Sequence, residues 1–201
     1  MPKVVDHEER RAEIADGVWR VIRRDGYAAL SVRTVAAETG RSVGAVRHYF
    51  EGQDALVAFA MQTLADRVGE RVRRLGADAT DLPGLVRLLE TVLPLDAARR
   101  AESEVWLALT MAARTDESLG AVWRQVHTRL RGLMESCVLT VQQVYGVDLD
   151  VATETTRLHA LTDGLALHGT LEPRLGARRI RAALTAHLQQ LAGSPAAAVD
   201  D

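Results

Sequence analysis

The sequence has 201 residues, of which 47% are hydrophobic, 26% are charged and 4% are aromatic. This length supports one large domain or two smaller ones with a buried core, so no disulfide or metal framework is required. The formal net charge of −2 excludes a chain that coats nucleic acid along its whole length.

The cellular context follows from what the sequence lacks. Cys137 is the single cysteine and cannot form an intrachain disulfide. The start, MPKVVDHEERR, lacks the apolar segment of a secretory signal, and no run approaches the roughly 18 apolar residues that cross a bilayer. We therefore expect a cytoplasmic protein with no membrane partner.

Three helices are expected near the N-terminus, at residues 8–25, 31–39 and 42–50. Gly26 is expected to end the first helix in the left-handed conformation. Ser31 and Ser42 are good N-caps for the two short helices, and Gly40 lies between them. Two helices of about two turns joined through a glycine are typical of a helix-turn-helix.

The remaining chain predicts helices at 53–75, 83–93, 96–114, 117–145, 150–171 and 177–192. The segment GADATDLPG, residues 76–84, is the clearest break. With no alternating strand pattern, we predict an all-α fold of about nine helices. Its domains are a helix-turn-helix domain at 1–52 and a ligand-binding and dimerisation domain at 53–193. The helix 53–75 connects the two, and a disordered tail follows at 194–201.

Positive charge and small residues gather in one stretch, SVRTVAAETGRSVGAVRHYF, residues 31–50. From Arg20 to His48 there are six arginines against two acids. A glycine inside a short helix costs about 1 kcal/mol relative to alanine, so Gly44 needs a reason, and close approach to DNA bases supplies one. The alternative is an ordinary helix-packing surface with solvated arginines.

Residues 10–56 resemble the N-terminal domain of TetR-type transcriptional regulators through DGYAALSVRTVAAETGRSVGAVRHYFEGQDAL. The resemblance implies a homodimer in which each protomer places its second short helix in the major groove of a palindromic operator. It also implies that a small molecule bound in the C-terminal domain lowers the affinity for DNA.

Site residues carried over from the resemblance fall into two groups. Contacts to bases are expected from Ser42, Val43, Gly44, Ala45 and Arg47. Contacts to phosphates are expected from Arg33, Thr34, His48 and Tyr49. Ser31 and Arg41 complete the predicted DNA-binding site.

The sequence departs from the family pattern at three places. Val43 replaces a common lysine, His48-Tyr49 reverses a frequent order, and Gly52-Gln53 lacks the usual Ser-Lys. Arg41 and Arg47 are expected to compensate. Arg47 is suited to bind guanine through two hydrogen bonds, worth roughly 1–3 kcal/mol of discrimination.

The C-terminal two-thirds resembles the BetI-like branch of the family, from EVWLALTMAARTDESLGAVWR to LTDGLALHGTL. Core packing is the simpler explanation for its aromatic and methionine residues, and the branch leaves the ligand open. If a pocket exists, its candidate residues are Trp106, Leu109, Thr110, Trp123, His127, Met134, His159 and Asp163.

His159 and Asp163 lie one helical turn apart, a spacing that suits either a metal ligand pair or a hydrogen-bonded pair. No HExxH motif, CxxC motif or second carboxylate at ligand spacing accompanies them, so we favour a satisfied His–Asp pair or interface hydrogen bonds. We expect no metal, no cofactor and no enzymatic activity. The helix 150–171 is apolar on two sides, which suits a subunit interface as well as an intrachain core. Together with the helix 177–192 it resembles the four-helix dimer interface of the family, to which each protomer contributes two helices.

Two functions from different classes remain at this point. The first is a homodimeric regulator, most simply a repressor, which binds a double-stranded DNA operator and is released by an unknown small-molecule inducer. The second is a small all-helical enzyme or ligand carrier with an incidental basic N-terminus. An activator with the same fold is a further alternative. Binding to duplex DNA with a steep salt dependence distinguishes the first from the second.

Overall fold

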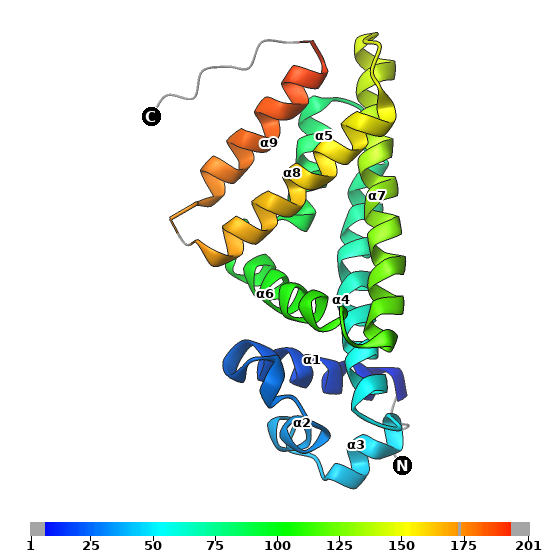
Figure 1. The fold of residues 1–201 in the computed structure, drawn as a ribbon, viewed down its shortest axis with the longest axis vertical. Coiled ribbons are helices and arrows are strands. Elements are labelled where there is room, and N and C mark those ends of the chain that lie inside the picture. The colour runs from blue at the N-terminus through cyan, green and yellow to red at the C-terminus, as the bar shows by residue number, and fades with distance from the viewer. Residues whose placement is uncertain (1–6, 173, 194–201) are drawn as a thin grey trace, which may run out of the picture. The chain divides into compact units, whose positions relative to one another are not determined.

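The computed structural model describes residues 7–172 and 174–193, so the predicted tail at 194–201 lies outside the described residues. Over that part of the chain the structure contains nine α-helices and no strand, which confirms the all-α prediction. The helices, drawn in Figure 1, are α1 His7–Asp25, α2 Val32–Glu38, α3 Val43–Tyr49, α4 Gln53–Gly76, α5 Leu82–Leu89, α6 Ala97–Ala112, α7 Glu117–Tyr145, α8 Val151–Leu171 and α9 Ala177–Leu191.

The chain divides into two compact units, each with its own apolar core. Unit 1 comprises the residues up to Arg67 together with Glu104–Gln125, and unit 2 comprises Val68–Ser103 together with the residues from Val126 onward. This division differs from the predicted boundary between residues 52 and 53, because parts of α4, α6 and α7 pack with the N-terminal helices. Tertiary packing, which local sequence patterns do not report, sets the difference.

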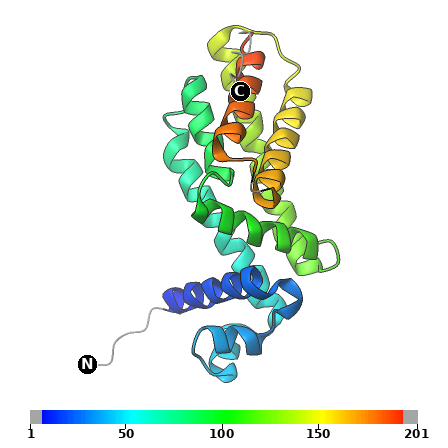
Figure 2. The ribbon, with the colours of Figure 1, turned by 90° about the vertical axis from the view of Figure 1, so that its left-hand side faces the viewer.

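Unit 1 is built around the apolar face of α1. Ile14, Val18 and Val21 are fully buried there, together with Val46 of α3 and Leu56 of α4. Figures 1 and 2 both show α2 and α3 on the same side of α1. The core therefore fixes the orientation of the two short helices.

The ends of α2 and α3 are set by local hydrogen bonds that the sequence predicted. The Thr34 amide donates to Ser31 Oγ at 3.0 Å, and the Ser31 amide donates to Thr34 Oγ1 at 2.9 Å, which forms a capping box. The Ala45 amide donates to Ser42 Oγ at 3.1 Å at the start of α3. Both predicted N-caps are confirmed.

Two glycines shape the turns beside these helices. Gly40 has φ 63°, which only glycine adopts without strain, and it allows the tight turn between α2 and α3. Gly26 has φ 81° with ψ 168°, so its φ is positive, but the predicted left-handed helical conformation is wrong. A short 3-10 helix, Tyr27–Ala29, follows and redirects the chain instead.

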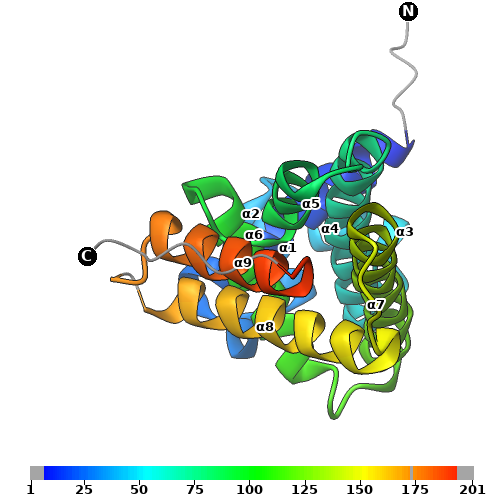
Figure 3. The same cartoon turned by 90° about the horizontal axis from the view of Figure 1, so that it is seen from above.

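Unit 2 packs α5, α8 and α9 with the greater part of α7. Its fully buried side chains include Met134 of α7, Leu158 of α8 and Leu184 of α9. Figures 1 and 3 show α8 and α9 side by side. A Cβ at Gly169 would lie 2.6 Å from Ile180 Cδ1, so a glycine is needed where these helices approach. Cys137 is also buried, and burial raises the pKa of its thiol to about 12.

The helices of unit 2 depart from prediction most clearly near Pro94. The predicted helix 83–93 ends at Leu89 as α5 and continues as a 3-10 helix, Glu90–Val92. Leu93 is extended, with ψ 147°, because the proline that follows disfavours the helical conformation at the preceding residue. Among the described helices, none is both long and apolar enough to span a bilayer.

Candidate nucleic-acid interface

The outer face of α3 carries small side chains and cations. Ser42, Gly44, Arg47 and His48 are exposed, whereas Val46 is buried against α1. A Cβ at Gly44 would meet only Ser42 Oγ, at 3.9 Å, so the fold itself does not require this glycine. The remaining predicted residues of α3 are half-buried, namely Val43, Ala45 and Tyr49. This face can approach another molecule closely.

Arg33 at the start of α2 and Arg47 on α3 are the cations available on this surface. Both are exposed, and neither forms an ion pair or hydrogen bond with any residue that the structure describes. Arg33 lies between Ser31 and Thr34, the two residues of the capping box, so its backbone position is fixed. Two guanidinium groups are therefore held by rigid helices with their donors unused.

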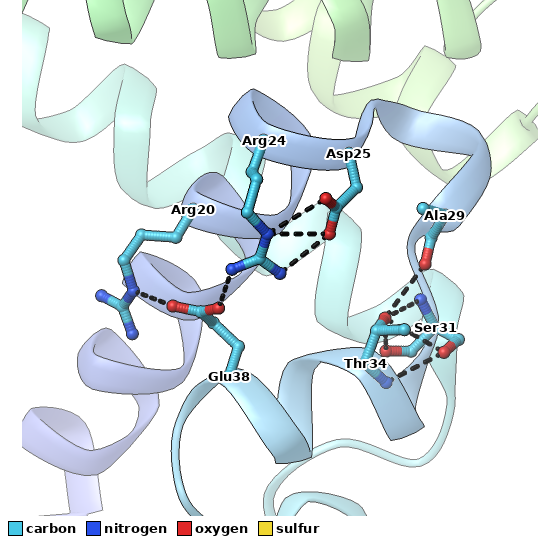
Figure 4. Close-up of polar contacts among 7 residues, drawn as sticks. All are labelled: Arg20, Arg24, Asp25, Ala29, Ser31, Thr34 and Glu38. Carbon is cyan, nitrogen blue, oxygen red and sulfur yellow. Dashed lines mark hydrogen bonds and ion pairs between the residues drawn. The ribbon is translucent and has the colours of Figure 1, made fainter.

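The arginines on α1 are engaged within the fold. In Figure 4, Glu38 of α2 accepts a hydrogen bond from Arg20 Nε at 2.6 Å and another from Arg24 Nη1 at 2.6 Å. Asp25 binds the other side of the Arg24 guanidinium. Hydrogen bonds from Arg20 and then Arg24 lower the pKa of the Glu38 carboxyl. This network neutralises charge that the sequence assigned to a polyanion-binding stretch.

Arg23 and Arg41 are paired as well. Arg23 donates to Glu104 of α6 at 3.0 Å, and Arg41 donates to Glu13 of α1 at 2.5 Å. The Arg41 side chain is only 22% exposed. Sequence reasoning missed these partners because Glu13 and Glu104 lie far from the arginines along the chain.

Ser31 and Thr34 also use their hydroxyl groups within the fold. Thr34 Oγ1 donates to the carbonyl oxygens of Ala29 and Ser31, at 3.1 and 3.0 Å, while it accepts from the Ser31 amide (Figure 4). The structure therefore gives Ser31, Thr34 and Arg41 a role in holding α2 and the turn that follows it. Their predicted contacts to DNA stay predictions.

Three rings meet at the end of α3. His48 and Tyr49 are edge-on at 5.3 Å between centroids, and His7 of α1 lies 4.9 Å from the Tyr49 ring and 5.8 Å from the His48 ring. His48 and His7 are exposed. Sequence reasoning did not include His7, because no local pattern joins it to a helix about forty residues away.

The eight pocket candidates divide evenly between the units. Trp106, Leu109, Thr110 and Trp123 belong to unit 1, and His127, Met134, His159 and Asp163 belong to unit 2. Leu109 and Met134 are fully buried core residues, which favours packing for both. Trp106 and Trp123 are partly buried against the core of unit 1.

A polar group lies on α7 and α8 of unit 2, in which His159 is buried and the Asp163 side chain is 59% exposed. The His127 and His159 rings stack at 4.6 Å between centroids, and His159 is 5% exposed. His159 Nε2 lies 3.6 Å from Asp163 Oδ2, which is an ion-pair distance but too long for a hydrogen bond. Burial lowers the pKa of His159, and Asp163 opposes this shift only in part. The predicted His–Asp pair is therefore present as a close contact but not as a hydrogen bond, and hydrogen bonds across a subunit interface stay a prediction.

Other polar features of unit 2 do not coincide with the candidates. A shallow groove on α7 and α8 is lined by Arg131, Ala152, Thr153, Thr156 and Arg157, none of which was predicted. Within residues 7–172 and 174–193, no three His, Cys, Asp or Glu side chains gather as metal ligands would.

Two family models match the chain. One describes bacterial regulatory proteins of the tetR family and matches residues 14–69, and the other describes the C-terminal part of BetI-type transcriptional repressors and matches residues 83–193, more than half of the chain. The chain belongs to the TetR family. It is a transcriptional regulator with an N-terminal DNA-binding domain and a C-terminal ligand-binding domain, which removes the enzyme alternative.

Relatives within the TetR family support the same assignment along the whole chain. The regulator PksA of Bacillus subtilis is 36% identical over 198 residues, covering 95% of this chain and 94% of its own. The regulator BetI of Vibrio vulnificus is 28% identical over 201 residues, covering 94% and 96% of the two chains.

Solved structures of regulators superpose with similar extent. One from Rhodococcus gives a TM-score of 0.79 at 29% identity, covering 90% of this chain and 95% of its own. A regulator from Saccharomonospora viridis in complex with choline gives a TM-score of 0.73 at 25% identity, with 91% and 95% coverage. TetR-family regulators bind DNA, dimerise and respond to ligands, and this chain shares that general function.

Proposed function

We propose that this TetR-family regulator is a repressor that reads a palindromic operator through α3, as a homodimer, and leaves it when a small molecule binds. The observation that carries the proposal is the outer face of α3, where small residues lie beside the unpaired Arg47 and near the unpaired Arg33. The family model that matches residues 83–193 describes BetI-type transcriptional repressors, which supports the negative sign of regulation.

Base reading and phosphate binding fall to different arginines in this proposal. Arg47 lies on the helix that enters the groove, and its planar fork suits guanine. Arg33 lies at the start of α2, where it is suited to a backbone phosphate. A phosphate contact adds affinity for every sequence, whereas a base contact adds affinity for the operator alone.

Mobility shifts on the DNA upstream of the protein's own coding region, with a scrambled duplex as reference, test this division. Arg47→Ala should weaken operator binding by about 1–3 kcal/mol and leave scrambled DNA nearly unaffected. Arg33→Ala should weaken both alike. Arg20→Ala is the matched control, because it removes the same charge from an arginine paired with Glu38. Equal losses on both duplexes for Arg47→Ala would refute its base-reading role.

We further propose that α8 and α9 form the dimer interface. Leu167 and Leu171 of α8 are 38% and 69% exposed, so α8 keeps apolar surface outside the core of unit 2. Leu171→Arg should shift the mass in light scattering from dimer to monomer. Leu139→Arg is the matched control on α7, where Leu139 is 46% exposed. A monomeric unmodified protein, or equal effects of both changes, would contradict this interface.

The effector is proposed to contact the polar group formed by His127, His159 and Asp163. His159 Nε2 is buried and lacks a hydrogen-bond partner within the described chain, which leaves a site for a ligand atom. Choline is the first compound to test, because a regulator with 25% identity was crystallised with it. Release of the operator by choline, and its loss in Asp163→Asn, would support the site. Calorimetry that detects no binding to the protein would exclude this compound.

A further inference from the structure

His7 opens α1, before the part of the chain that the family model describes. The tetR-family match begins at residue 14. The side chain nevertheless lies against the end of α3, with its ring 4.9 Å from Tyr49 and 5.8 Å from His48 between centroids. The first residue of α1 therefore shares a surface with the helix that is proposed to read DNA.

The three rings offer the same kind of chemistry. Each imidazole has a ring N–H and Tyr49 has a phenolic O–H, and these groups donate to phosphate oxygens. His7 and His48 are exposed and Tyr49 is half-buried, so the donors are accessible to solvent. The centroids of the three rings lie within 5.8 Å of one another, so the three side chains can contact the same phosphate group.

Charged residues of α1 and α3 surround the three rings. On α1, Arg10 donates to Glu13 at 2.9 and 3.1 Å. Arg11 lies 3.5 Å from Glu8 and stacks over the Phe59 ring at 4.2 Å. Glu9 is a further acid of the first turn. On α3, Arg47 directly precedes His48.

We propose that His7 is a further DNA-binding residue, which holds a backbone phosphate together with His48 and Tyr49 and strengthens DNA binding when it takes up a proton. The inference rests on the proposed function of α3. Histidine is the side chain suited to change its charge between pH 5 and 8, and a cation beside a phosphate releases a bound counterion. DNA affinity and its salt dependence should therefore both rise towards acid pH.

The test uses the full chain and a short duplex of random sequence, because a phosphate contact does not depend on sequence. Binding is measured by fluorescence anisotropy over a salt series at about pH 6 and about pH 8. His7→Phe keeps a ring beside Tyr49 and removes the donors and the charge. His7→Gln keeps a donor without the charge. His168→Phe in α8 is the matched control for replacing an exposed histidine.

At about pH 6 the logarithmic salt slope of His7→Phe should be shallower than that of the unmodified protein by about 0.9 per bound His7. A ten-fold rise in salt should then weaken the unmodified protein about eight-fold more than the variant. At about pH 8, His7→Gln should bind DNA as the unmodified protein does. At about pH 6, its salt slope should equal that of His7→Phe. His168→Phe should behave as the unmodified protein at both.

Three outcomes separate the inference from the proposed function. If His7→Phe binds like the unmodified protein at both pH values while Arg33→Ala is weaker, the His7 ring only packs against Tyr49 and the inference is overturned. If His7→Phe weakens binding equally at both pH values without changing the slope, the proton is not involved and the inference is again overturned. If the unmodified protein binds no duplex at low salt, the proposed function fails together with it.

Discussion

The two units place their polar groups in opposite ways. The buried core of unit 1 is wholly apolar, and several of its charged residues form ion pairs near the surface, such as Arg20 and Arg24 with Glu38. The buried polar residues of the described chain all belong to unit 2, and they are Thr91, Thr155, His159 and Thr162. A DNA-reading surface needs rigid support, whereas a ligand-responsive unit needs polar groups inside.

The consequence for stability differs between the units. Apolar burial in unit 1 stabilises the fold, although Thr110 Oγ1 of α6 is a buried atom without a hydrogen-bond partner among the described residues. In unit 2, Thr155 Oγ1 and His159 Nε2 are buried without a hydrogen-bond partner among the described residues, which costs free energy unless a ligand satisfies them. Substitutions in the two units can test this difference.

The largest expected effect is on the core of unit 1. Leu109 was a pocket candidate but is 0% exposed, so Leu109→Ala should lower the free energy of unfolding by about 2–5 kcal/mol. Urea unfolding followed by circular dichroism measures the loss. Leu171→Ala is the control, because Leu171 is 69% exposed. If Leu109→Ala left the stability unchanged and altered the ligand response, Leu109 would be a pocket residue and not a core residue.

Gly44→Ala should separate stability from DNA binding in unit 1. A Cβ at this position meets nothing closer than 3.9 Å, so alanine should raise the free energy of unfolding by up to about 1 kcal/mol. The same methyl group should weaken operator binding, since it lies on the face that is proposed to approach the bases. Thermal unfolding and mobility shifts measure the two effects.

Gly17→Ala is the contrasting variant for that experiment. Its Cβ would lie 2.4 Å from Thr39 Cγ2, where α1 packs on α2, so this alanine should destabilise unit 1. A Gly44→Ala protein that binds the operator with undiminished affinity would show that close approach does not explain the glycine.

A matched pair of threonines tests the buried polar groups of unit 2. The Thr155 hydroxyl lacks a described partner, so Thr155→Val should raise the free energy of unfolding by about 1 kcal/mol. Thr162 Oγ1 donates to the Leu158 carbonyl at 2.8 Å, so Thr162→Val should give no such gain. Chemical unfolding of both variants makes the comparison, and equal changes would contradict it.

The smallest expected effect is a pH dependence from His187 of α9. Burial lowers the pKa of His187, with Arg157 acting in the same direction and Glu154 opposing it. The unfolded chain then binds the proton more readily, so stability is complete above about pH 6.5 and falls as the pH drops below it. His187→Gln should flatten this decline in unfolding experiments. His159 shifts in the same direction and should leave a residual slope.

Local signals made much of unit 1 predictable. The caps Ser31 and Ser42 and the turn at Gly40 act within a few residues, so the sequence alone located α2 and α3. The partners of the arginines were not predictable in this way. Arg20 and Glu38 are separated by 18 residues, and their contact depends on how α1 packs on α2.

Unit 2 was predictable only in part, for the same reason. Helical periodicity located α7, α8 and α9 closely, but it does not report which side chains converge. Trp106 and His127 read alike as pocket candidates along the chain, yet they belong to different units. The stacking of His127 on His159 joins two helices and has no local signature.

The buried thiol of Cys137 can report how often unit 2 opens. A thiol that is 1% exposed, with its pKa raised to about 12, does not react while the helices around it stay closed. The chain has one cysteine, so each labelling event reports one opening of the structure around α7. A compound that binds in unit 2 and tightens its packing should lower the rate at which the Cys137 thiol is labelled. The labelling rate can therefore be used to screen for the effector without DNA.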